Sequence, residues 1–297
     1  MNESPITAKV VAHSKCPEGP EIVTFEVEQP KFLNAEVNTH RMFSRNGSSS
    51  RAIPTAQIIE QIKNSPYIPF DVRANEKGMQ GFEQVSPEIY EDFKEELQTL
   101  LLQLTEFARD ASAKEGLNIH KQHISRYLEP FMMQKFLITT TELDNWFALR
   151  DHDAAQPEIR DLAKKMRIAL EASSPIHIDY NEWHCPYFQD VPKNLEDGRF
   201  PEELLISAGC AAAVSYRNKP DPTKAIAIAD KLLESGHMSP FEHIATPLDP
   251  KMCLGDASNS PFADSHISIR LDGSLWGANF RGWGQLRGIL ERAKELE

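Results

Sequence analysis

The sequence predicts an α+β fold. Strand-like and helical segments alternate irregularly instead of forming repeated strand–helix–strand units, which disfavours a doubly wound parallel sheet. Residues 6–13 and 22–27 have the composition of strands, and the turn-forming sequence Cys-Pro-Glu-Gly-Pro lies between them. Residues 86–111, by contrast, carry apolar side chains at spacings of three and four, which is typical of a long amphipathic helix.

The amino-terminal third is expected to contain two strands and a short helix. The second strand alternates apolar and polar residues, so we expect it to bury one face and to end at Pro30. Residues 32–41 then lead into a segment rich in Arg and Ser, and 56–63 form a short helix. Residues 64–85 are rich in Pro, Gly and Asn, which indicates a long surface excursion.

The longest helix has a recognisable start and stop. Ser86 is a suitable cap, Pro87 suits the first helical position, and Gly116 ends the apolar pattern. After it the sequence predicts, in order, a helix over 119–128, a strand over 136–141, a polar crossover from 145–150, a helix over 157–172, a loop, lid or core-packing insertion over 173–204, a helix over 223–235 closed by Gly236, a strand over 267–271 and a helix over 284–297.

Composition is ordinary for a globular protein. The 297 residues are 40% hydrophobic and 26% charged, and we expect one domain over 1–297 with a buried core. No apolar run approaches a membrane span and no signal-peptide pattern occurs, so we expect a cytoplasmic protein without a membrane partner. A net charge of −12 argues against nucleic-acid binding.

The four cysteines are far apart in the sequence and form no CxxC pair, which predicts free thiols and no metal site. The adjacent His184 and Cys185 could supply metal ligands, but no second cluster of ligands accompanies them.

Residues 38–51 hold the densest group of polar side chains. The segment reads Asn-Thr-His-Arg-Met-Phe-Ser-Arg-Asn-Gly-Ser-Ser-Ser-Arg, with three arginines and four serines around one glycine. Guanidinium groups bind phosphate bidentately, and a turn rich in Gly and Ser can direct backbone N–H groups at an anion. The segment therefore suits a phosphate or another polyanion; a solvated basic loop is the alternative.

Common catalytic devices are missing from the sequence. No GxxxxGK[ST], GxGxxG or GxSxG motif occurs, which disfavours a P-loop enzyme, a Rossmann dinucleotide site and a serine hydrolase. Other polar blocks remain, and each has a structural alternative. Arg126 and Arg150 could be surface ion-pair partners, residues 155–158 could begin a helix, and His237 and His243 could be structural histidines.

Taken together, the blocks resemble the flavin-dependent thymidylate synthases (the ThyX family). The family signature is Arg-His-Arg, seven residues, then Ser; here Thr39-His40-Arg41 is followed at that interval by Ser49. The other matches are Ser44, Asn46 and Arg51 within the signature; Leu149-Arg150, Ala155-Gln156 and Glu158-Ile159, similar to the second hallmark; Arg126, Leu128 and Pro130, similar to Ala-Arg-x-x-Leu-Pro; 236–243, similar to Gly-His-x-[Ser/Thr]-Pro-Phe-Glu-His; and 211–216, similar to Ala-Ala-Arg-Val-Ser-Tyr.

The order of these blocks differs from the usual one. In the usual family member the last two blocks precede the signature, whereas here they follow it. We therefore expect a permuted arrangement in which 207–247 supply the part that ordinarily begins the fold. Residues 53–85 and 173–206 remain as loop or insertion segments, and 280–287 resemble a degenerate second copy of the segment around the signature.

The resemblance implies a central sheet flanked by long helices, in a homotetramer whose active sites form between subunits. It implies FAD, reduced by NADPH, and transfer of a one-carbon unit from methylenetetrahydrofolate to C5 of dUMP, with the flavin supplying the difficult chemistry. By position, the FAD contacts would be His40, Arg41, Asn145, His237 and Ser239. The nucleotide, chiefly its phosphate, would be held by Ser49, Arg51 and Arg126, with the two arginines from a neighbouring subunit.

Two of these residues are the catalytic candidates, Ser49 and Arg150. Arg150 would face the pyrimidine and stabilise charge that develops on it. Departures from the family pattern gather around the expected substrate. They are Thr39 for Arg, Gly47 for Glu, Ala52 for Tyr, Glu36 for Gln, Glu129 and Ser125 beside Arg126, and Ala154 for a His of some members, with His152 two residues away.

These departures keep two alternatives open. One is hydroxymethylation of dUMP or dCMP on the same scaffold, with water ending the reaction. The other is a non-catalytic paralogue that binds a nucleotide or a flavin, although the retention of the four expected nucleotide-binding residues argues against it. The sequence leaves open the base, the one-carbon donor and the reductant.

Overall fold

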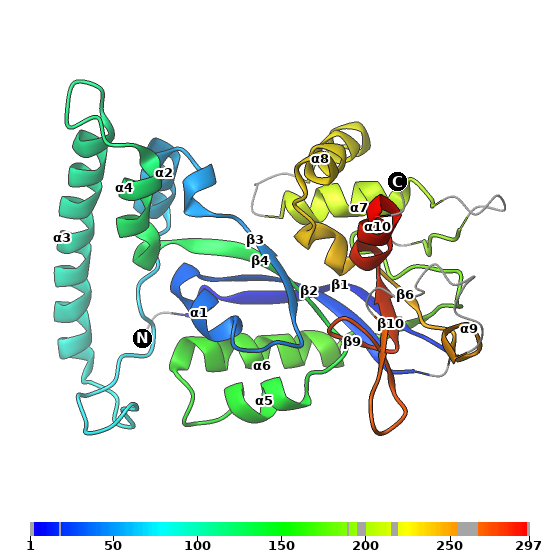
Figure 1. Cartoon of the computed structure of the whole chain (residues 1–297). Coiled ribbons are helices and arrows are strands. Elements are labelled where there is room, and N and C mark those ends of the chain that lie inside the picture. The colour runs from blue at the N-terminus through cyan, green and yellow to red at the C-terminus, as the bar shows by residue number, and fades with distance from the viewer. Residues whose placement is uncertain are drawn as a thin grey trace.

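A mixed sheet forms the centre of the molecule (Figure 1). The computed structural model describes residues 3–17, 19–188, 190–194, 200–214, 219–254 and 267–295. Within them, five strands are arranged in the order β3-β4-β2-β1-β5. They are β1 (Thr7–Lys15), β2 (Glu21–Pro30), β3 (Ser44–Gly47), β4 (Met133–Thr140) and β5 (Ile176–His177). Neighbours pair antiparallel except β1 and β5, which are parallel. The predicted α+β class is confirmed.

One face of the sheet is covered by α5 (Asp144–Arg150) and α6 (Pro157–Glu171). Helix α6 begins with Pro157 at its first position, as the sequence indicates, and its apolar stripe packs on Phe25 and Val27 of β2. The prediction of a polar crossover before α6 is wrong. The segment is helix α5, and it is held to the sheet because Trp146 and Phe147 are buried in the same core.

Strand β2 is buried on both faces, although its alternating pattern predicted only one. Thr24 and Ile22, on the second face, are fully inaccessible to solvent. Ile22 packs in a separate cluster with Phe280 and Trp283. The second face is thus covered by segments that lie far along the chain, which a local pattern cannot reveal.

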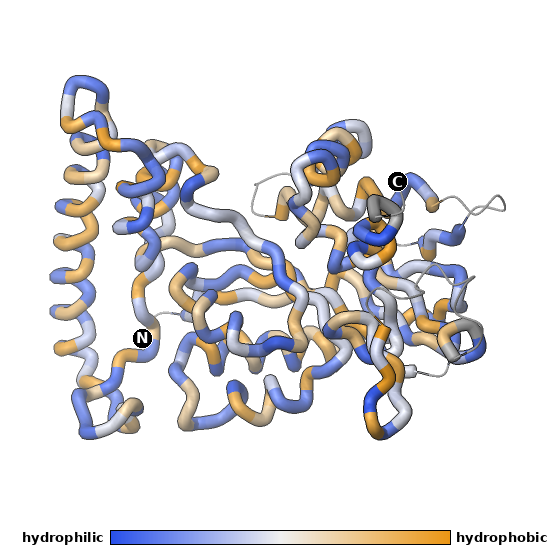
Figure 2. The backbone as a smooth tube through the Cα atoms, in the orientation of Figure 1, coloured by the Kyte–Doolittle hydropathy of each residue, from blue (hydrophilic) through white to orange (hydrophobic). Residues whose placement is uncertain are grey.

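A helical layer stands beside the sheet (Figure 1). It consists of α2 (Thr55–Asn64), α3 (Pro87–Ser112) and α4 (Lys121–Leu128), which share one apolar core. The predicted start of α3 is confirmed, since the Ser86 hydroxyl accepts a hydrogen bond from the Ile89 N–H. Apolar residues continue along the whole of α3 (Figure 2). Four of them stay exposed on one stripe: Ile89, Phe93, Leu100 and Phe107.

The carboxyl-terminal part packs on the second face of the sheet. Its helices are α7 (Glu203–Ala212), α8 (Pro222–Ser235), α9 (Pro250–Leu254) and α10 (Leu286–Glu295). Its strands are β6 (Ala245–Pro247), which pairs with β10 (Trp283–Gln285), and β7 (Ile267–Ile269), β8 (Leu275–Gly277) and β9 (Phe280–Arg281). Gly236 ends α8 with a φ of 72°, which favours glycine.

The remaining elements are short. They are α1 (Asn34–Val37) and the 3₁₀ turns η1 (Lys31–Leu33), η2 (Ser50–Ala52), η3 (Glu129–Phe131) and η4 (Ser239–His243). Of the alternatives for 173–204, the described residues support an insertion that packs on the core, because Trp183 and His184 are buried. No described helix combines the length and the apolarity needed to cross a membrane.

Candidate active site

The segment 38–51 is more ordered than a flexible basic loop. Its middle forms strand β3, which pairs with β4 so that Gly47 lies opposite Phe136. A Cβ added to Gly47 would lie 2.4 Å from the Phe136 ring, so this glycine serves close packing rather than flexibility. Ser44, Arg45, Asn46 and Gly47 gave no strand pattern, because β3 is stabilised by its pairing with β4 and not by an apolar face.

His40 and Arg150 meet at the end of this segment. The Arg150 Nε donates to His40 Nε2 at 3.0 Å, and Arg150 Nη2 donates to the Thr39 hydroxyl at 3.2 Å. The His40 ring also contacts Trp146 edge-on, with the ring centroids 4.7 Å apart. Arg150 is at the last position of α5, so the buried Trp146 in the preceding turn fixes where the guanidinium lies.

The charge of His40 follows from these contacts. Burial, with Arg150 and Arg45 nearby, lowers the pKa of His40 to about 4. The ring is therefore neutral at pH 7. Because Nε2 accepts from a guanidinium, the proton of the neutral ring is on Nδ1. Thr39 takes part in this arrangement through its hydroxyl, which accepts from Arg150 Nη2.

Arg150 also borders an open groove of about 1050 Å³ between the 69–82 excursion, Phe93 of α3 and the 148–160 segment. The alternative that 155–158 begin a helix is confirmed, since Pro157 is the first residue of α6. Glu158 in that turn is buried and accepts a hydrogen bond from the Tyr67 hydroxyl. Asn145 is exposed on the first turn of α5.

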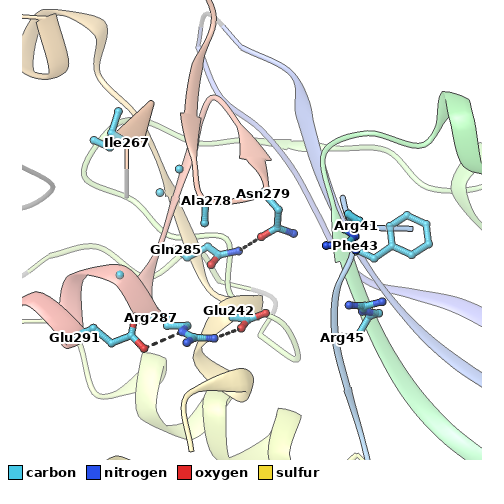
Figure 3. Close-up of a pocket in the computed structure, with 13 residues that line it drawn as sticks. Arg41, Phe43, Arg45, Glu242, Ile267, Ala278, Asn279, Gln285, Arg287 and Glu291 are labelled. Atoms are coloured by element: carbon cyan, nitrogen blue, oxygen red, sulfur yellow. Dashed lines mark hydrogen bonds and ion pairs between the residues drawn. The ribbon is translucent and has the colours of Figure 1, made fainter. Parts of the chain in front are cut away.

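Arg41 lines a second cavity, of about 380 Å³, together with Arg45 (Figure 3). Its opposite wall comes from the carboxyl-terminal segments. There Arg287 pairs with Glu242 and Glu291. Arg41 itself is exposed and points to the cavity from the segment that precedes β3.

Two carboxamides join the wall of this cavity to β3, and sequence reasoning did not single them out. Gln285 Nε2 donates to the Ser44 hydroxyl at 3.0 Å and to Asn279 Oδ1 at 2.7 Å. Both residues lie in or beside 280–287, which resembled a degenerate copy of the segment around the signature. That resemblance stays a prediction.

The block 207–247 lies next to β3. Asn46 Nδ2 donates to the Ala211 carbonyl at 2.7 Å, and the Ser239 hydroxyl donates to Asn46 Oδ1 at 3.3 Å. His237 is exposed, and its Nδ1 lies 2.9 Å from the Ser235 hydroxyl. Residues 215 and 216 of the Ala-Ala-Arg-Val-Ser-Tyr-like block lie outside the described residues. The structure thus brings the two blocks together, while the permutation stays a prediction.

His243 is buried in a chain of hydrogen bonds, which fits the structural alternative for Nδ1, whereas its Nε2 has no hydrogen-bond partner among the described residues. Its Nδ1 lies 2.8 Å from the Thr139 hydroxyl, which bonds Thr24, which in turn lies 2.8 Å from Nε2 of His184. Burial lowers the pKa of both histidines to about 3, so both are neutral. This buried chain of hydrogen bonds fixes η4, and with it Ser239, to strands β2 and β4.

His184 also contacts Ser14, so both of its ring nitrogens are engaged. Among the residues that the structure describes, no group of three or more His, Cys, Asp and Glu could hold a metal ion.

The predicted phosphate ligands gather at η2 and α4. Ser49 caps η2, with its hydroxyl accepting from the Arg51 N–H at 3.4 Å, and both side chains are exposed. Arg126 donates to Glu129 Oε1 at 3.1 Å, and the Ser50 hydroxyl donates to the same oxygen. Arg126 thus forms an exposed ion pair, and its role at a phosphate stays a prediction, whereas no carboxylate in the described part of the chain pairs with Arg150.

Comparison with known proteins supplies the last finding. The model of a family described as thymidylate synthase complementing protein matches residues 13–176. No curated protein sequence matches the chain significantly. Among solved structures, a UMP/dUMP methylase, PolB from Streptomyces cacaoi bound with 5-Br UMP, is 17% identical with a TM-score of 0.46, over 57% of this chain and 90% of that one.

A flavin-dependent thymidylate synthase, ThyX from Helicobacter pylori complexed with FAD and dUMP, is also similar. It is 17% identical with a TM-score of 0.36, over 50% of this chain and 67% of that one. The matched residues 13–176 make up more than half of the chain. They include two arginine clusters, Arg150 with its partners His40 and Thr39, and Arg51 with Arg126 at η2 and α4. This protein therefore belongs to the thymidylate synthase complementing (ThyX) family.

Proposed function

We propose that this protein is a flavin-dependent thymidylate synthase-like enzyme, which transfers a one-carbon unit to C5 of dUMP. The observation that carries the proposal is the Arg150 guanidinium, which only neutral groups hold. His40 Nε2 and the Thr39 hydroxyl accept from it, and no described carboxylate pairs with it. Its full positive charge is therefore available to a ligand.

That charge suits a pyrimidine. Nε and one hydrogen of Nη2 are used within the protein, so Nη1 can donate to a carbonyl oxygen of the base. Negative charge that develops on the base during C5 chemistry would be stabilised there, in a site whose donor is already oriented. A neutral His40 supports this arrangement, because a protonated ring would repel the guanidinium.

The residues near β3 fit a flavin dinucleotide. Arg41 and Arg45 offer two guanidinium groups at one cavity, which suits a diphosphate. His40, Arg41, Asn145, His237 and Ser239 would hold FAD. When bound, FAD would supply the hydride chemistry that these side chains lack. NADPH and methylenetetrahydrofolate as co-substrates rest on family membership alone.

Ser49, Arg51 and Arg126 would hold the nucleotide phosphate. Arg126 is on α4 of the helical layer, and Ser49 and Arg51 are at η2 beside α4, whereas Arg150 is on α5, which covers one face of the sheet (Figure 1). We infer that one active site combines Arg150 of one subunit with the phosphate cluster of another, in a homo-oligomer. The exposed apolar stripe on α3 supports such association, since contiguous exposed apolar side chains often mark a protein–protein interface.

Subunit mixing tests the shared site. Arg126→Ala and Arg150→Ala should each be inactive alone, but co-refolded subunits should regain partial activity, because some sites then contain both arginines. Lack of recovery would assign each site to one chain. Leu100→Lys on the stripe should lower the mass measured by light scattering, and Gln98→Lys, exposed on α3 but away from the stripe, should not.

Two measurements test the reaction itself. The purified protein should show the visible absorption of a flavin, alone or after addition of FAD; a colourless protein that binds no FAD contradicts the enzymatic proposal. Tritium release from C5-labelled dUMP and dCMP, with mass analysis of the product, then separates methylation of dUMP from hydroxymethylation of either base. The second reaction stays a candidate because Thr39 has replaced an arginine directly beside Arg150.

A further inference from the structure

Lys31 is a buried lysine beneath the turn that carries Ser49 and Arg51. It follows Pro30 at the start of η1, and its residue is only 7% exposed. Nζ donates to the Ser48 carbonyl at 2.8 Å and to Gln134 Oε1 at 2.9 Å. The Lys31 N–H also donates to the carbonyl of Met132, the residue before β4, and this hydrogen bond fixes the Lys31 backbone next to the start of that strand.

Both acceptors of the Lys31 ammonium are neutral, and no carboxylate forms an ion pair with it in the described part of the chain. Burial lowers the pKa of Lys31; the charge of Glu129 opposes this shift and that of Arg126 adds to it. Burying an ammonium without a counter-ion is costly. An apolar side chain of similar length would fill the same space without that cost, so the charge points to a ligand.

The surroundings of the turn show what that ligand would meet. A cavity of about 360 Å³ beside the turn is lined by Ser48 and Gln134, which accept from Lys31, and also by the charged residues Glu28 and Lys135. On its other side, the turn is tied to Glu129 through the Ser50 hydroxyl at 2.5 Å. The turn is therefore held on one side by the Lys31 ammonium and on the other by the Glu129 carboxylate, which also accepts from Arg126.

We propose that Lys31 is a positioning residue for the anion bound at the Ser49–Arg51 turn. It would fix the Ser48 carbonyl, and so the orientation of the following residues, and it would add a buried positive charge beneath the anion. In a low-dielectric setting such a charge is screened far less than one on the surface. The nature of the anion, a nucleotide monophosphate, rests on the proposed function.

The test compares a charged ligand with its neutral counterpart. Binding of dUMP, deoxyuridine and inorganic phosphate is measured by calorimetry on the wild-type protein and on Lys31→Met. We expect dUMP and phosphate to bind about tenfold more weakly or worse, and deoxyuridine to bind within about twofold of wild type. Equal losses for dUMP and deoxyuridine would mean a structural role only, and an unchanged dUMP affinity would also overturn the proposal.

Lys121 offers a matched control. Its Nζ donates to the Ala52 carbonyl at 3.3 Å, at the other end of the same turn, but in an exposed setting. Lys121→Met should change the phosphate and dUMP affinities by no more than about twofold, because solvent screens that charge. Lys31→Arg, which keeps the charge, should restore part of the selectivity for dUMP over deoxyuridine.

Further variants and ligands separate the possible failures. Lys31→Gln keeps an N–H donor without the charge and should behave as Lys31→Met does; if neither variant folds, Lys31 serves the fold and the proposal fails. If the wild type binds phosphate through Lys31 but binds no dUMP, the proposed function fails and the anion site stands. If dUMP binds but Lys31→Met does not change its affinity, the proposal for Lys31 fails and the proposed function stands.

Discussion

The two arginine clusters of this protein differ in whether a carboxylate neutralises their positive charge. Arg150 is held by a neutral histidine and a hydroxyl beside buried aromatic rings, and no described carboxylate reduces its charge. Arg126 is exposed and shares Glu129 with Ser50. A guanidinium that stabilises developing charge works best uncompensated and fixed, whereas a phosphate that must enter and leave is suited by a partly neutralised, solvated cluster.

The largest expected effect follows from removing the uncompensated charge. Arg150→Ala should lower kcat by about 10²- to 10³-fold, the usual cost of losing one oriented donor at a developing charge. The fold should persist, because its guanidinium lies partly at the surface. Steady-state kinetics and thermal melting measure both.

Arg167→Ala is the control for Arg150. Arg167 pairs with Asp151 and lies over Phe147, next to α5 but outside the proposed site. It should change kcat by less than about threefold. An Arg150 variant with unchanged turnover would remove the main distinction between the two clusters.

Lowering the pH should affect dUMP binding at the Arg126 cluster before it affects the Arg150–His40 hydrogen bond. The second pKa of a phosphate monoester is about 6, so dUMP affinity should fall by about tenfold between pH 7 and 5 as the dianion is lost. The lowered pKa of His40 favours its neutral form, so the Arg150–His40 bond is intact above pH 6.5 and is lost only as pH falls through about 4.

At saturating dUMP, kcat should therefore show no loss from His40 between pH 7 and 5. His40→Asn, which can accept a hydrogen bond but does not titrate, is the control and should lack the limb near pH 4. If kcat instead falls as the pH drops through 6.5, and His40→Asn abolishes this fall, His40 takes up a proton at the usual pKa of histidine, contrary to its contact with Arg150.

Removing the carboxylate of the second cluster should strengthen binding. Glu129→Gln keeps an oxygen that can accept from Ser50 and Arg126 but loses the negative charge, so dUMP should bind about three- to tenfold more tightly. Calorimetry at low salt measures this. Glu142→Gln, which alters an ion pair with Arg281 outside the cluster, should have no effect. Weaker binding would mean that Glu129 serves orientation more than charge.

The smallest expected effect concerns Thr39. Thr39→Val removes one hydrogen bond from Arg150 Nη2 but leaves the bond to His40, so kcat should fall about two- to fivefold. Thr141→Val, which removes the hydroxyl that accepts from Arg281 N, is the control and should leave kcat unchanged. A loss as large as that of Arg150→Ala would make Thr39 a principal support of the guanidinium.

Local patterns predicted the helices better than the strands. The cap of α3 at Ser86 and the end of α8 at Gly236 were correct, because capping depends on a few neighbouring residues. Helix α5 was missed because only two of its seven residues are buried, and β3 because its polar residues have no apolar face. Both elements are held by contacts with strands distant in the sequence.

The sequence by itself determined the family, the α+β class and the identity of the polar blocks, because residue types at fixed spacings are local information. Only the tertiary structure decided that His40 holds Arg150, that Glu129 holds Arg126, and that Lys31 lies beneath the phosphate turn. Charge and pKa depend on burial and on partners distant in the sequence, such as His40 and Arg150, which are 110 positions apart. Those quantities appear only once the chain has folded.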